Sequence, residues 1–209
     1  MIGQAAAVAP FLPPSALPFV EALLRRHAVH LRISRPRRTK LGDHRPPLPG
    51  QRVHRISINE DLNRYAFLTT LLHELAHVAA WSDRRGRRAR PHGPEWRRAF
   101  ADILEPVVAA GVLPEDVTTA LAGTLRNPRA ATCSDRALLL ALARYDEPVC
   151  GRLRVEDLPD GALFRIETGS VFRAARRLRS RRQCFHARTG AEYRVHGLAL
   201  VEPVARVVR

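Results

Sequence analysis

The run His73-Glu74-Leu75-Ala76-His77 places two histidines four residues apart, with a glutamate beside the first. The chain has nine histidines, and a sequence of this length and composition would contain the pattern by chance roughly 0.02 times. On an α-helix, His73 and His77 would lie on one face, about 40° apart around the axis, and could bind one zinc ion. Glu74 would be turned by about 100° from His73, away from the ligand set but within reach of a water molecule there. The run therefore predicts a hydrolytic zinc site.

A catalytic zinc site needs a third protein ligand and one open position. The extended pattern H-E-x-x-H-x-x-G-x-x-H is excluded, because Ala80 occupies its glycine position and Asp83 its third histidine position. Two donors follow further along: His92, after an arginine-rich loop, and Glu95, at the start of the next predicted helix. The residue types alone leave both open as the third ligand.

The elements that must position these residues can be predicted from periodicity. Apolar residues recur at helical spacing over 62–81, so the run lies inside a long helix that Asn59 or Asp61 could cap. Further helices are predicted at 15–29, capped by Ser15, at 95–104, in short pieces at 107–110 and 115–122, and at 135–145, capped by Ser134. Alternating residues at 30–33 and 53–58 predict an antiparallel pair of strands.

The pattern changes after residue 151. Short alternating runs with glycine turns at Gly169 and Gly190 predict a small β-barrel with strands at 162–166, 171–178, 183–187, 191–195 and 198–201. We therefore expect a first domain over 1–125, a linker with one helix over 126–150, and a basic β-barrel domain over 151–209. The expected fold class is α+β: a zincin-like helical domain with a short β-sheet, followed by the barrel.

Two motifs together, the run at 73–77 and His92-Gly93-Pro94-Glu95-Trp96, resemble the SprT-like zinc metalloprotease family, which includes the Spartan-related domains. The resemblance covers about residues 16–125. It implies one zinc ion per chain held by His73, His77 and His92, with Glu74 as the proton acceptor in peptide hydrolysis, and it implies protein substrates on DNA. Many relatives carry a C-terminal four-cysteine zinc ribbon, which Cys133, Cys150 and Cys184 cannot form.

The charge of the chain indicates a polyanionic partner. Lysine and arginine number 35 against 20 acidic residues, a net charge of +15. Lys40 is the one lysine, so a GC-rich coding bias also explains part of the arginine content. We expect non-sequence-specific contact with the DNA backbone. The candidate residues are Arg84, Arg85, Arg87, Arg88, Arg176, Arg177, Arg179, Arg181 and Arg182.

These observations lead to one main hypothesis and two rivals. The main one is a zinc-dependent metalloendopeptidase that acts on DNA-associated or DNA-crosslinked proteins. The first rival is a non-enzymatic DNA-binding or regulatory protein with a structural zinc site, and the second is a zinc peptidase without a DNA role. No segment approaches the ~18 uncharged apolar residues of a membrane-spanning helix, so we expect a cytoplasmic, nucleoid-associated protein without a membrane partner.

Overall fold

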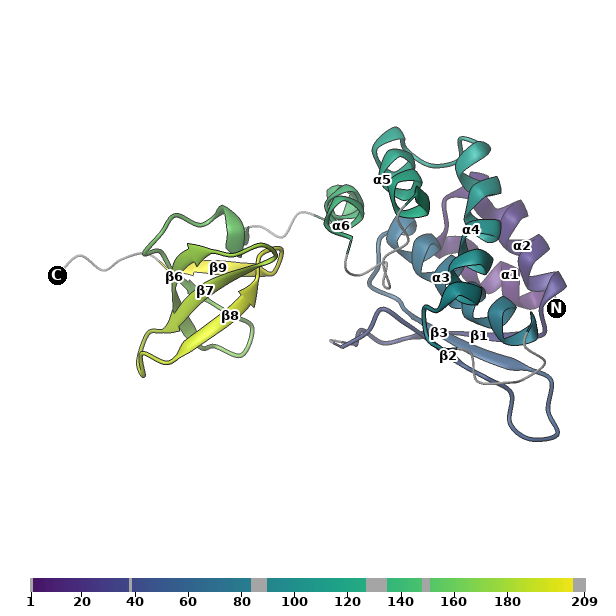
Figure 1. The fold of residues 1–209 in the computed structure, drawn as a ribbon, viewed down its shortest axis with the longest axis horizontal. Helices are drawn as coiled ribbons and strands as arrows, with labels where there is room; N and C mark the ends of the chain where they lie inside the picture. Colours follow the sequence, from purple (N-terminus) through teal and green to yellow (C-terminus); the bar gives the residue numbers. More distant parts are fainter. Residues whose placement is uncertain (1, 38, 84–89, 127–134, 148–150, 205–209) are drawn as a thin grey trace. The chain divides into compact units, whose positions relative to one another are not determined.

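The computed structural model describes residues 2–37, 39–83, 90–126, 135–147 and 151–204. Its chain divides into two compact units, Met1–Glu147 and Pro148–Arg209 (Figure 1). The α+β class is confirmed, since helices and two separate sheets are present. Within the described ranges, no helix combines the length and the apolar character that crossing a membrane requires.

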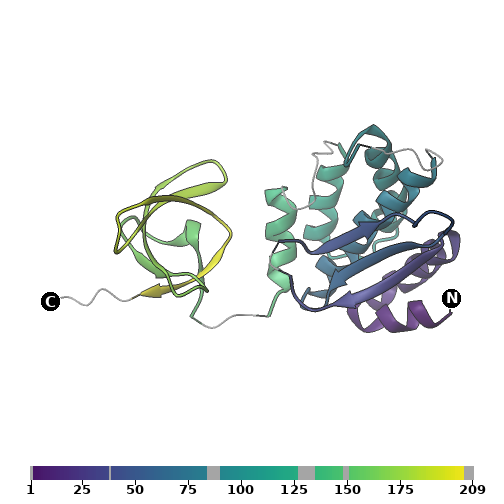
Figure 2. The ribbon, with the colours of Figure 1, turned by 90° about the horizontal axis from the view of Figure 1, so that it is seen from below.

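The first unit is a three-stranded sheet covered by helices (Figure 2). Its strands are β1 (Val29–Ser34), β2 (Gly42–Arg45) and β3 (His54–Asn59). Its helices are α1 (Ile2–Val8), α2 (Leu17–Arg26), α3 (Arg64–Asp83), α4 (Pro94–Ala109), α5 (Glu115–Arg126) and α6 (Arg136–Leu142). The predicted helices at 107–110 and 115–122 are the last turn of α4 and most of α5.

The prediction that the strands at 30–33 and 53–58 form an antiparallel pair is wrong. β1 and β3 are parallel, with Leu31 opposite Ile56, and β2 pairs antiparallel with the other side of β3. The missed strand β2 is only four residues long, and its sequence Gly-Asp-His-Arg lacks an apolar alternation. β2 forms one edge of the sheet and contacts helix α3, which carries His73 and His77.

Helix α3 is the centre of the first hydrophobic core. Phe67, Leu71 and Leu75 are fully buried in it, between the sheet and α4. Its cap is neither Asn59 nor Asp61. The side-chain oxygen of Asn63 accepts hydrogen bonds from the backbone N–H groups of Tyr65 and Ala66, at 3.1 and 3.0 Å.

The short helix α6 packs on the first unit. Leu138 is fully buried in the core of that unit, and the Asn63 amide donates a hydrogen bond of 3.0 Å to the Leu142 carbonyl. Its N-cap is Asp135, whose carboxylate also accepts a hydrogen bond from Thr124, while the predicted cap Ser134 lies outside the described residues. The boundaries drawn from the sequence at 125 and 151 remain predictions, but residues 135–147 belong to the first compact unit.

The second unit is a six-stranded antiparallel sheet. Its strands are β4 (Leu153–Arg154), β5 (Leu163–Arg165), β6 (Val171–Arg177), β7 (Arg181–His186), β8 (Glu192–His196) and β9 (Leu200–Val204), in the order β4-β9-β5-β6-β7-β8. Gly169 and Gly190 have φ angles of 86° and 71°, the left-handed conformation that their tight turns require. No pairing closes the two edge strands among the described residues, so the barrel remains a prediction.

Arg182 is a buried arginine that connects several backbone segments of the second unit. Its side chain is 1% exposed, and its guanidinium donates to the backbone carbonyls of Ala175 and Val155 at 2.8 and 2.9 Å. It also contacts the Leu158 carbonyl and the Asp160 carboxylate. A buried guanidinium whose donors are used in this way cannot bind a phosphate, so the predicted DNA contact at Arg182 is wrong.

We expect Arg182→Met to destabilise the second unit by about 3 kcal/mol, because several buried carbonyls would lose their hydrogen-bond donor. The matched control is Arg181→Met, which changes an exposed arginine on the same strand and should stay within about 0.5 kcal/mol. Thermal unfolding of the full chain by calorimetry measures both variants. Equal effects of the two changes would contradict the structural role.

Candidate metal centre

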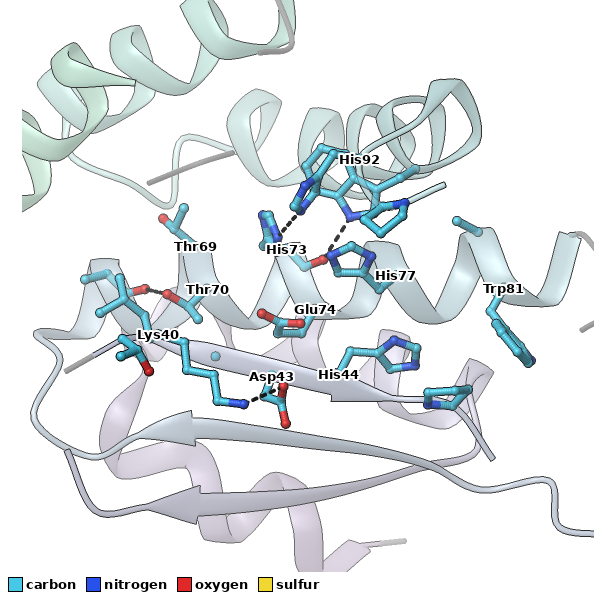
Figure 3. Close-up of a pocket in the computed structure, with 18 of the residues that line it drawn as sticks. Lys40, Asp43, His44, Thr69, Thr70, His73, Glu74, His77, Trp81 and His92 are labelled. Atoms are coloured by element: carbon cyan, nitrogen blue, oxygen red, sulfur yellow. Dashed lines mark hydrogen bonds and ion pairs between the residues drawn. The ribbon is translucent and has the colours of Figure 1, made fainter. Parts of the chain in front are cut away.

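Three histidines converge between α3 and the start of α4 (Figure 3). One ring nitrogen from each of His73, His77 and His92 lies within 4.8 Å of the other two. The two Nε2 atoms of His73 and His92 are 3.0 Å apart. Two nitrogens bound to one tetrahedral zinc ion at ~2.1 Å would be about 3.4 Å apart, so the observed spacing is close to that of two ligands of one cation.

The turn before α4 delivers the third histidine. His92 has a φ angle of 56°, a conformation uncommon for a residue with a Cβ and often associated with functional sites. The Gly93 N–H donates to the Arg90 carbonyl at 2.9 Å and closes the turn, and Pro94 then begins the helix. Glu95, the other candidate ligand, lies in the first turn of α4 and is not part of the histidine cluster.

Trp96 packs against the rings of His73 and His92, a role that was not predicted from the sequence. It is 2% exposed, its ring centroid lies 4.6 Å from His73 and 4.7 Å from His92, and it stacks on Phe100 at 4.9 Å. Its indole N–H points at the His73 carbonyl, at 3.4 Å. The H-G-P-E-W motif therefore supplies both a histidine and the apolar surface that fixes the orientation of the imidazole rings.

The rings are electrostatically suited to a cation. Burial lowers the pKa of His73 to about 3, with a further contribution from His92, and burial with the neighbouring histidines lowers the pKa of His77 to about 3. Burial also lowers the pKa of His92. Neutral imidazoles present lone pairs, which a zinc ion requires of its ligands. Among the described residues no fourth His, Cys, Asp or Glu joins the group, which leaves a coordination position open.

Glu74 lies on the neighbouring face of α3 and faces strand β2 at the edge of the sheet. Its side chain is 6% exposed, and burial raises the pKa of its carboxyl to about 7, with Asp43 adding to the rise and Arg37 and Lys40 opposing it. A carboxyl with a pKa near neutral can both take and return a proton at pH 7.

Strand β2 lies directly against the Glu74 side chain. A Cβ on Gly42 would lie 2.7 Å from Glu74 Oε1 and 2.7 Å from Thr70 Cγ2. Only a residue without a side chain lets the strand approach this closely. The register pairs Gly42 with Ile58 and His44 with Ile56, so both β2 residues share the face of the sheet that covers α3.

The added methyl group of Gly42→Ala should displace the Glu74 carboxylate or the strand, and hydrolysis that depends on this carboxylate should fall by about 10²-fold. Zinc content should stay unchanged, since Gly42 is not part of the histidine cluster. The matched control is Gly123→Ala on α5, where an added Cβ meets nothing within 4 Å. Full activity of the Gly42 variant would show that β2 does not constrain the carboxylate.

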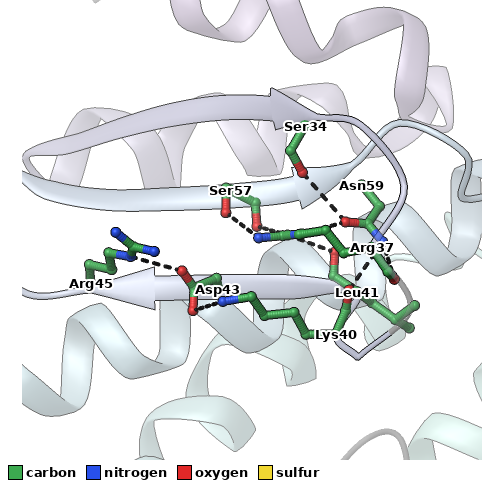
Figure 4. Close-up of polar contacts among 8 residues, drawn as sticks. All are labelled: Ser34, Arg37, Lys40, Leu41, Asp43, Arg45, Ser57 and Asn59. Atoms are coloured by element: carbon green, nitrogen blue, oxygen red, sulfur yellow. Dashed lines mark hydrogen bonds and ion pairs between the residues drawn. The ribbon is translucent and has the colours of Figure 1, made fainter.

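A polar network fixes the connection that leads into β2 (Figure 4). The Arg37 guanidinium donates to Asn59 Oδ1 at 2.8 Å and to Ser57 Oγ at 2.9 Å. The Asn59 amide donates in turn to the carbonyls of Arg37 and Lys40, at 3.2 and 3.1 Å. Asn59 therefore anchors the loop before β2.

The cluster opens into a cavity of about 490 Å³. Its walls come from the loop and strand around β2, from α3, and from the turn before α4. Leu139 and Leu142 add an apolar wall from α6. The three histidines themselves line this cavity.

The predicted DNA-binding arginines fall into three groups. Arg84, Arg85, Arg87 and Arg88 lie outside the described residues. Arg176, Arg177, Arg179 and Arg181 are exposed at the β6–β7 hairpin of the second unit. Arg182 is buried, as described above.

Comparison with known proteins identifies the first unit. Residues 18–118 match the family model of the SprT-like family. This match confirms the resemblance noted from the two motifs, and it is consistent with an enzyme of the zinc-metallopeptidase type. No curated protein and no solved structure matches the chain.

Proposed function

We propose that the protein is a zinc-dependent endopeptidase that cleaves proteins associated with or crosslinked to DNA. The observation that carries the enzymatic part is the convergence of three histidines beside a buried glutamate in an open cavity, within a SprT-like domain. A purely structural zinc site would use a fourth protein ligand, which the described part of the chain does not supply.

His73, His77 and His92 would hold one zinc ion per chain. When bound, zinc acidifies water and polarises the scissile carbonyl. Glu74 accepts the proton of the attacking water and returns it to the leaving amine, and burial sets its pKa for both steps. The covering strand at Gly42 limits the positions that the carboxylate can take.

The DNA part of the proposal is supported by charge. The net charge is +15, and Arg176, Arg177, Arg179 and Arg181 gather at one exposed hairpin. No carboxylate forms an ion pair with these four residues among the contacts described for this chain. Such a group fits contact with the phosphate backbone without base recognition.

The test compares cleavage of one protein in two forms, covalently attached to a duplex oligonucleotide and free in solution. Cleavage of the attached form alone, dependent on zinc, supports the proposal. Equal cleavage of both forms would favour a zinc peptidase without a DNA role. Stable zinc and DNA binding without any cleavage would favour the non-enzymatic alternative.

Replacing the four hairpin arginines by glutamine should reduce the slope of log K for DNA binding against log salt concentration by about 3–4, at ~0.9 per lost phosphate contact. The measurement is a salt titration of oligonucleotide binding by the full chain. The control replaces Arg152 and Arg165, which form ion pairs with Glu167 and Glu202, and should leave the slope nearly unchanged. An unchanged slope in the hairpin variant would remove the hairpin from the DNA contact.

A further inference from the structure

His44 is a polar side chain of the cavity that the steps above do not use. It stands on β2 beside Glu74 and His77 (Figure 3), and its ring is parallel to that of His77, with centroids 5.9 Å apart. Its Nε2 atom lies 2.9 Å from Nδ1 of His54, a 6% exposed residue on the neighbouring strand β3. The contact with His54 therefore holds the His44 ring in place within the sheet.

Peptide hydrolysis develops negative charge on the scissile carbonyl oxygen, and a fixed hydrogen-bond donor there lowers the barrier. Several other donors of the cavity are engaged. The hydroxyls of Thr69 and Thr70 donate to helix carbonyls at 2.8 Å each. The Lys40 ammonium contacts the Asp43 carboxylate at 2.7 Å.

Thr39 and Arg90 also line the cavity, but both are exposed to solvent. A donor that is exposed to solvent must be ordered at each turnover, whereas a donor held by the fold costs no reorganisation. His44 combines partial burial, a hydrogen bond within the sheet and proximity to the ring of His77.

The contact with His54 also bears on which nitrogen of His44 carries the proton. A neutral imidazole has one N–H, so one ring of the pair donates and the other accepts. If His54 Nδ1–H donates to His44 Nε2, the proton of His44 is on Nδ1. Among the described residues, the structure gives Nδ1 of His44 no hydrogen-bond partner, so a proton on this atom would be available to a substrate in the cavity that His44 lines.

We propose that His44 is a catalytic residue that donates a hydrogen bond from Nδ1–H to the oxyanion of the tetrahedral intermediate, and that His54 is the positioning residue that fixes its ring and tautomer. This inference rests on the proposed protease function.

The proton of His44 stays on its nitrogen throughout. Water oxygen forms the new bond to the carbonyl carbon, its proton moves to Glu74, and the π electron pair moves to the carbonyl oxygen. The electron pair of the oxyanion then re-forms the C=O bond as the C–N bond breaks, the C–N electron pair goes to nitrogen, and Glu74 returns the proton to the leaving amine, which leaves a carboxylic acid and an amine. His44 hydrogen-bonds to the oxygen while it carries the extra charge.

The experiment compares three substitutions at position 44 and one at position 54, all in the zinc-loaded full chain with the protein–DNA conjugate as substrate. His44→Phe keeps a planar ring without a donor and should lower kcat by about 10²–10³-fold, with KM within about twofold of wild type. His44→Asn places an amide near the position of Nδ1 and should restore at least tenfold of that loss. His44→Gln places its amide near Nε2 and should restore less. His54→Phe should lower kcat by less than His44→Phe does.

Zinc content and the absorption spectrum of the cobalt-substituted protein are measured on the same samples. One metal ion per chain and an unchanged spectrum, together with a loss in kcat and rescue by asparagine, support the proposal. Metal loss in His44→Phe would assign His44 a structural role and overturn it. An active wild type with an equally active His44→Phe variant, or with His44→Asn no better than His44→Phe, overturns the role of His44 alone. A zinc-loaded wild type without activity overturns the proposed function, and this inference with it.

Discussion

Replacing Glu74 by glutamine should lower peptide cleavage by roughly 10²–10⁴-fold while zinc stays bound. The substitution keeps the size of the side chain at a site that strand β2 approaches closely, since a Cβ on Gly42 would lie 2.7 Å from Glu74 Oε1. Glutamine cannot accept a proton, so the attacking water would lose its base and the leaving amine its acid. The measurement is the initial rate of cleavage of the protein–DNA conjugate, with metal content determined on the same samples.

Glu95→Gln is the matched control for this prediction. Glu95 lies in the first turn of α4, outside the histidine cluster, so the same chemical change there should leave turnover within about twofold of wild type. A Glu74→Gln variant that cleaves as fast as wild type, with zinc present, would mean that another group takes the proton.

The sequence predicted the histidine helix well because its signal is local. Two histidines at a four-residue spacing, within a long run of apolar residues at helical period, define both the helix and the face that carries the imidazoles. The position of His92 relative to this face depends on a loop and a turn with a φ angle of 56°, which periodicity does not encode. The family resemblance, not the spacing, selected His92 over Glu95.

The edge strand was not predicted, because its pairing is non-local. Gly42 and His44 belong to a four-residue strand, too short for a pattern, and their importance comes from the register with β3 and from the close approach to Glu74. A glycine two residues before a histidine in a basic loop gave no indication of either. The parallel pairing of β1 with β3 was not predicted for the same reason, since alternation identifies strands but not their direction.

Arginine clusters were the least informative feature of the sequence. Arg181 and Arg182 are adjacent and chemically identical, yet one is exposed and the other is the most deeply buried arginine described in the second unit. Strand alternation assigns the two residues to opposite faces, but the charge argued against placing either inside. The surrounding carbonyls of residues 155, 158 and 175, together with the Asp160 carboxylate, explain the burial.

His92→Ala should remove zinc from the purified chain. Two imidazoles from one helix hold a cation far more weakly than three converging donors, and the affinity loss should exceed the roughly 10–100-fold that accompanies loss of a residue supporting a ligand. Metal analysis after dialysis against a weak chelator should give one zinc ion per wild-type chain and almost none in the variant. Proteolysis should fall with the metal.

Glu95→Ala separates the two candidate ligands, which are three residues apart in one motif. It should retain a full zinc ion, because Glu95 lies outside the cluster formed by the three histidines. Loss of zinc from Glu95→Ala, with retention in His92→Ala, would transfer the third position to the glutamate. Because His92 Nε2 already lies 3.0 Å from His73 Nε2, such a result would require the turn before α4 to rearrange when the metal binds.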